Sequence, residues 1–178
     1  MTESTARKSL LKYSMESGVW LGLYLIVRFV FTVTSMYSVM ANILALALYV
    51  GTPFVVYRIM LQYHRNNGYI SFFSLLWMMG IMLFFFASLI SCIPEYIFYE
   101  YINPQYVTEL LDNTFVKLDE MDLLKGNTSL ESMRKALDEG GAPTSIQMIL
   151  QSIWSNVFFG SLLSMVVAPF VLRKKRKV

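Results

Sequence analysis

Four apolar blocks constrain this 178-residue chain, because each is long enough to cross a lipid bilayer. They cover residues 17–36, 39–60, 71–98 and 146–172. A helix rises about 1.5 Å per residue, so roughly 20 apolar residues cross a hydrocarbon core about 30 Å thick. Backbone polar groups in lipid must bond within their own segment, which predicts helices. We therefore expect an all-α fold, a four-span transmembrane helical bundle that forms a single integral membrane domain over residues 1–178.

The composition agrees with this class. Hydrophobic residues make up 56% and charged residues 15% of the chain, whereas charged residues make up about 25% of a soluble domain. The first block is too long for a signal peptide and lacks a small-residue cleavage site, so we interpret it as a retained span. With one His and one Cys, the sequence predicts no metal site and no cofactor.

The charges predict an orientation. Cations precede the first span, Arg58 and Arg65 lie between the second and third spans, and a basic run follows the fourth span. Residues 100–145 instead carry nine acidic and four basic side chains. Because basic short loops stay in the cytoplasm, we expect both termini to be cytoplasmic and the segment 99–145 to be extracytoplasmic.

The basic run after the fourth span is predicted to bind anionic lipid. A nuclear signal or nucleic-acid patch is the alternative reading of such a run. Its position directly after an apolar helix favours the membrane surface, where each cation contributes roughly 1 kcal/mol. We therefore expect the lipid bilayer, and no nucleic acid, as its partner. The run consists of Arg173, Lys174, Lys175, Arg176 and Lys177.

The stretch "YRIMLQYHRNNGYISFF" between the second and third spans contains the single histidine, His64. We interpret it as a cytoplasmic elbow, with His64 in water and Gly68 supplying a tight backbone turn. Its basic surroundings make His64 a poor catalytic base.

Small residues at four-residue spacing predict where helices approach closely, because small side chains favour association in lipid. Two interpretations stay open: packing within one bundle, or a homodimer through Gly18 and Gly22. The predicted packing residues are Ser14, Gly18 and Gly22 on the first span, Ala47 and Gly51 on the second, and Gly160 and Ser164 on the fourth.

Arg28 lies about two-thirds of the way along the first span, where a guanidinium costs at least about 2.5 kcal/mol unless it is paired or hydrated. We expect Glu95 near the outer end of the third span to be its partner, with Asn42 as a neutral alternative. Three roles remain open for Arg28: a structural ion pair or interfacial anchor, part of a ligand or lipid-headgroup site, or part of a transport path.

The outer segment is predicted to be partly helical. Asn103 and Pro104 stop the third span or begin a new helix. A first amphipathic helix and a second element with a capping box at Thr128 and Glu131 follow. The apolar face of the first helix contains Val107, Leu110, Leu111, Phe115 and Leu118, and that of the second element contains Leu130, Met133 and Leu137.

No phosphate loop, nucleophile elbow or zinc-protease pair occurs in the sequence. We therefore expect a non-enzymatic protein. If it were a membrane enzyme, Glu95, Tyr96 and Glu100 would be its only plausible centre.

Three stretches carry a resemblance to a known family: "SGVWLGLYLIVRFVF", "YRIMLQYHRNNGYISFFSLLWMMGIM" and "IPEYIFYEYINPQ". Over nearly its whole length the chain resembles the bacterial membrane proteins of domain-of-unknown-function family 4199. The resemblance implies a small inner-membrane protein with four helices and no catalytic residues to carry over. It also points to a membrane-associated glycosyltransferase as one candidate partner.

Two functions are consistent with these features. The first is an accessory or scaffold subunit that binds a membrane protein partner through its small-residue faces. The second is a transporter or lipid-binding membrane protein that uses Arg28 as an anion site.

Overall fold

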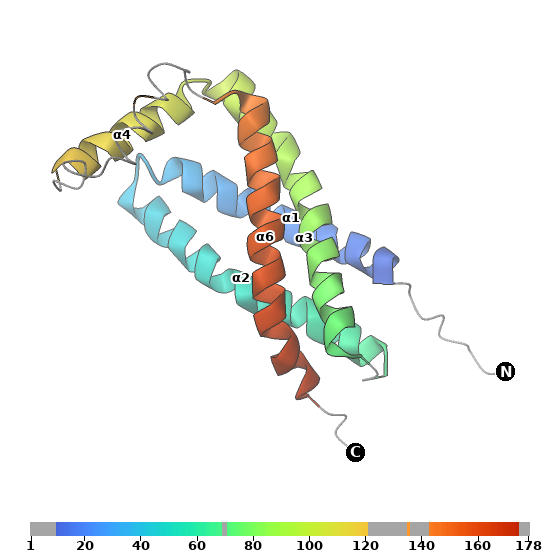
Figure 1. Ribbon diagram of the computed structural model, residues 1–178. Coiled ribbons are helices and arrows are strands. Elements are labelled where there is room, and N and C mark those ends of the chain that lie inside the picture. Colours follow the sequence, from blue (N-terminus) through green and yellow to red (C-terminus); the bar gives the residue numbers. More distant parts are fainter. Residues whose placement is uncertain (1–9, 69–70, 121–134, 136–142, 175–178) are drawn as a thin grey trace. The chain divides into compact units, whose positions relative to one another are not determined.

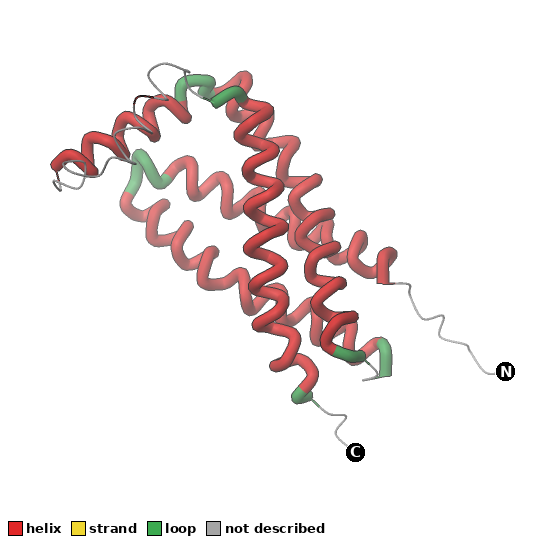
Figure 2. The backbone as a smooth tube through the Cα atoms, in the orientation of Figure 1, coloured by secondary structure: helices red, strands yellow, loops and turns green. Residues whose placement is uncertain are grey.

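The computed structural model describes residues 10–68, 71–120, 135 and 143–174, and these residues form helices and turns without any strand (Figures 1 and 2). The predicted all-α class is confirmed. The helices are α1 (Leu10–Thr34), α2 (Val39–Asn66), α3 (Phe73–Ile97), the π-helix η1 (Phe98–Ile102), α4 (Tyr106–Glu120) and α6 (Ser145–Leu172).

Four of these helical segments are long and apolar enough to cross a membrane, so the chain is a four-span membrane protein. The span at α2 continues past the predicted end at residue 60, and the third span continues through η1 to Ile102. The fourth begins at a capping box, in which the Thr144 N–H donates to Gln147 Oε1 over 2.9 Å and the Gln147 N–H donates to Thr144 Oγ1 over 3.4 Å. These reciprocal bonds satisfy backbone donors that a helix N-terminus leaves open.

The chain divides into two compact units. The first contains Met1–Ile93 and Gln151–Val178, and the second contains Pro94–Leu150. Within the first unit, α1 and α2 form an antiparallel pair joined by a short turn, and α3 and α6 run side by side (Figure 1).

Glycines bring the helices of the first unit into close contact. A Cβ atom added at Gly18 would lie 2.7 Å from Phe86 Cβ on α3, and one added at Gly22 would lie 2.9 Å from Ile90 Cβ. On the other side of α3, a Cβ atom at Gly160 of α6 would overlap the Phe84 ring. Such close approach maximises van der Waals contact where lipid gives no hydrophobic driving force.

The elbow after α2 differs from the prediction in one respect. Gly68 has a φ of 66°, which confirms that it supplies left-handed backbone. His64, however, is only 2% exposed, so the expectation of a histidine in water was wrong. The reason is that α2 continues to Asn66, which puts His64 one turn after Met60 on the buried face of the helix.

The second unit contains the predicted amphipathic helix as α4. Val107 and Phe115 are buried, Leu111 and Leu118 are half-buried, and Leu110 is 37% exposed. The third span ends at Asn103, as predicted, and its N–H donates to the carbonyl of Phe98 over 2.9 Å. The second outer element, with Thr128, Glu131, Leu130, Met133 and Leu137, lies outside the described residues.

Candidate functional site

Arg28 of α1 is held by two uncharged groups. Its Nη2 donates a hydrogen bond to Asn156 Oδ1 of α6 over 2.9 Å. Its Cζ lies 4.6 Å from the centre of the Tyr49 ring of α2. A hydrogen bond to a charged group contributes about 1.5–3 kcal/mol, and a cation–π contact about 0.5–2 kcal/mol. Together these contacts offset much of the cost of a guanidinium in a span, but neither neutralises its charge.

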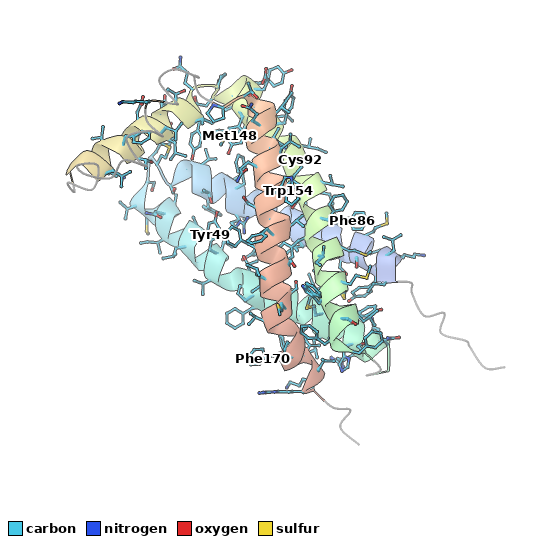
Figure 3. All side chains as sticks on the ribbon, in the orientation of Figure 1. Tyr49, Phe86, Cys92, Met148, Trp154 and Phe170 are labelled. Atoms are coloured by element: carbon cyan, nitrogen blue, oxygen red, sulfur yellow. The ribbon has the colours of Figure 1, made fainter. Side chains whose placement is uncertain are left out.

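The three residues border a cavity of about 540 Å³ between α1, α2, α3 and α6. Figure 3 shows the Tyr49 side chain beside α6. The polar groups around Arg28 include the Ser155 and Thr52 hydroxyls, and Thr52 Oγ1 donates to the Leu48 carbonyl over 3.0 Å. This volume falls within the range of small-molecule pockets.

Pro53 adds a polar backbone group to this region of α2. Proline has no N–H, so Pro53 cannot donate to the carbonyl of Tyr49 one turn earlier. Both residues line the cavity. Pro53 therefore lies in the wall of the site.

Neither predicted partner of Arg28 is found beside it in the first unit. The Asn42 side chain is exposed on α2 and is not among the residues that line the cavity. Glu95 is buried on α3 with 5% of its surface exposed and belongs to the second unit. Its pairing with Arg28 stays a prediction, whereas Asn156 and Tyr49 were not anticipated.

The charge around the site is one-sided. Among the described residues of the first unit, Glu16 is the one carboxylate, and it lies about 18 Å from Arg28 along the axis of α1. Six cationic side chains accompany it: Lys12, Arg28, Arg58, Arg65, Arg173 and Lys174. Among the described residues of the first unit, an anion that enters the cavity would therefore meet the Arg28 guanidinium with no carboxylate nearer than Glu16.

The predicted packing residues have different surroundings. Ser14, Gly18, Gly22, Gly160 and Ser164 are buried, Gly51 is half-buried against the Tyr24 hydroxyl, and Ala47 is exposed. The contacts of Gly18 and Gly22 are with α3 of the same chain.

Gly80 is a packing residue that the sequence did not predict. A Cβ atom there would overlap Ser164 and lie 2.7 Å from Met60 Cε. No small residue lies four positions from Gly80 on α3, so the pattern of two small residues at four-residue spacing does not include it. The only signal was a glycine inside an apolar helix.

In the described part of the chain, no three His, Cys, Asp or Glu side chains form a group that could hold a metal ion. Of the predicted lipid-binding tail, Arg173 and Lys174 are exposed at the end of α6. Lys175, Arg176 and Lys177 lie outside the described residues.

Comparison with known proteins gives one match. The model of a family described as "Protein of unknown function (DUF4199)" matches residues 16–173, nearly the whole chain. No curated protein and no solved structure matches.

Proposed function

Since the chain belongs to the DUF4199 family, whose description assigns no activity, we propose a function from the site itself: a non-enzymatic membrane protein that binds an anionic group in the Arg28 cavity. The group is a phosphate or carboxylate carried by a lipid or by an amphiphilic solute. The observation that carries the proposal is a guanidinium in a span whose two contacts, Asn156 and Tyr49, are both uncharged.

The shape of the cavity supports an amphiphile. Phe84, Phe159 and Leu163 supply apolar wall, while Arg28 and Asn156, which are hydrogen-bonded to each other, supply a polar group. Arginine suits a phosphate or carboxylate because its planar fork donates two parallel hydrogen bonds. In this proposal the protein lies in the bacterial inner membrane with both termini cytoplasmic, which the distribution of cations supports.

Asn156→Asp tests the proposal with little change in shape. The substitution puts a carboxylate beside Arg28, where it supplies an internal counter-ion. We expect it to compete with a bound anion and to remove about one charge-assisted hydrogen bond, which corresponds to roughly 10- to 100-fold weaker binding. The same internal pair should leave the melting temperature of the free protein unchanged or higher.

The measurement is native mass spectrometry of the detergent-purified protein with lysophosphatidic acid and, separately, inorganic phosphate. Asn42→Asp is the matched control, because it makes the same amide-to-acid change at an exposed position of α2 outside the cavity lining. Binding of both probes would indicate a site for the phosphate group alone, and binding of lysophosphatidic acid alone would indicate an amphiphile. Equal binding by wild type and Asn156→Asp would refute the proposal.

An accessory or scaffold role is the second candidate, and one observation favours it. Ala47 is an exposed small residue on α2, whereas Gly18 and Gly22 contact α3. A membrane partner would then approach α2 at Ala47. Crosslinking of a tagged copy in native membranes should recover a stoichiometric protein that Ala47→Trp loses, and a partner retained by this variant would exclude that surface.

A further inference from the structure

A second cavity, of about 820 Å³, lies at the C-terminal ends of α2 and α6 and is basic. Arg58 and Arg65 of α2 and Lys174 after α6 line it, and Gln62 and Asn66 add two amides. Its lining contains no acidic residue. The three cations come from segments more than 100 residues apart in sequence, so the fold itself gathers them.

An apolar groove of about 590 Å³ adjoins this basic pocket. Its wall includes Phe54 of α2 and Val166 and Phe170 of α6, which are 68%, 61% and 57% exposed. Tyr57 and Lys174 line both the groove and the basic pocket. Polar and apolar binding surfaces are therefore continuous along the seam between α2 and α6.

We propose that the pocket and groove together bind one anionic phospholipid. The phosphate lies among Arg58, Arg65 and Lys174, and one acyl chain lies along Phe54, Val166 and Phe170. Basic pockets between transmembrane helices are suited to phospholipid head groups. An acidic protein helix would also match the charge, but it would leave unexplained why an apolar groove adjoins the cations and shares Tyr57 and Lys174 with them.

This site shares Pro53 and Leu163 with the Arg28 cavity but none of its polar side chains, and it differs from attraction by the tail alone. It needs Arg58 and Arg65, which are on α2, and it needs the groove. It is therefore sensitive to a change in α2 that leaves the basic tail unaltered.

Two pairs of variants of the full chain test the proposal. Arg58→Gln with Arg65→Gln removes two pocket cations and leaves the basic tail unaltered, and Lys12→Gln with Lys117→Gln removes two cations that do not line the pocket. Val166→Trp fills the groove. Val50→Trp is its control, because Val50 is equally exposed at 61% and lines neither the groove nor the pocket.

Binding is measured by native mass spectrometry with dioleoyl-phosphatidylglycerol, and with dioleoyl-phosphatidylcholine for comparison. Each cation near a membrane surface contributes roughly fivefold in affinity. The variant that lacks two pocket cations should therefore bind phosphatidylglycerol roughly 25-fold more weakly than the wild type. Val166→Trp should also weaken binding of phosphatidylglycerol. The cation control and Val50→Trp should bind it with the affinity of the wild type.

Two results would overturn the proposal. An equal loss in Lys12→Gln with Lys117→Gln would mean that total charge, and not the pocket, attracts the lipid. Full binding by Val166→Trp would mean a site for a free head group or phosphate without an acyl chain.

Discussion

Gly160→Ala perturbs the contact between α6 and α3 by a single methyl group. That methyl would overlap the Phe84 ring, whose Cδ1 would lie 2.7 Å from it. Phe84 is 3% exposed, so its ring has little free space to move into. Overpacking costs about 1–3 kcal/mol, while replacing a helical glycine by alanine gains up to about 1 kcal/mol. We expect a net loss of about 0–2 kcal/mol in the free energy of unfolding.

The effect should change sign when Phe84 is shortened. Phe84→Ala alone should cost about 3–5 kcal/mol through the cavity that it leaves. In that background the added methyl at position 160 meets open space, and Gly160→Ala should be neutral or stabilising by up to about 1 kcal/mol. The two substitutions should therefore be coupled by about 1–3 kcal/mol.

The free energies come from unfolding in mixed micelles with a rising fraction of dodecyl sulfate, followed by the fluorescence of the three tryptophans. Phe85→Ala is the matched control background, because Phe85 is the next residue, is 44% exposed, and is not among the atoms nearest Gly160. Gly160→Ala should behave there as it does in wild type. A coupling with Phe84→Ala below about 0.5 kcal/mol would show that the ring does not close on Gly160, and the packing argument would fail.

Two further substitutions test the packing of α1 and the elbow. Gly18→Leu puts a side chain into Phe86 on α3, so it should lower the melting temperature without changing the oligomeric state. Val19→Leu on the exposed face is the control. Light scattering that showed a dimer becoming monomeric at unchanged stability would support the homodimer instead. Gly68→Ala should lower the free energy of unfolding by about 1–2 kcal/mol, because the φ of Gly68 is positive. Gly68→Asn should lower it by less, since asparagine tolerates that backbone. Equal losses of stability in the two variants would argue against the left-handed turn.

The existence of the four long helices was predictable from local sequence, whereas some of their ends were not. A span is a long apolar run, and its prediction needs no knowledge of neighbours. Gly68 was predictable because a turn of this kind needs left-handed backbone. The misjudged environment of His64 came from ending α2 at residue 60, since the helical period from Met60 predicts burial once the helix continues.

The partners of Arg28 were not predictable in the same way. Sequence position estimates how deep a residue lies along its helix, and that criterion selected Glu95. It does not determine how each helix is rotated about its axis or which helix is its neighbour. Asn156 and Tyr49 reach Arg28 because α6 and α2 present those faces to the cavity. The rotation of each helix about its axis depends in turn on close packing at other positions, such as Gly160.

The wall shared by the Arg28 cavity and the apolar groove has a consequence for thermodynamics. Pro53 and Leu163 line both spaces, so the groove borders the wall of the Arg28 cavity, and a ligand dissolved in the bilayer would reach this wall without first dissolving in water. For such a ligand the relevant concentration is its mole fraction among the lipids. An apparent Kd expressed in molar units would then change with the amount of detergent or lipid in the sample. Two laboratories using the same protein would obtain the same Kd only after expressing the ligand concentration as a mole fraction of the membrane phase.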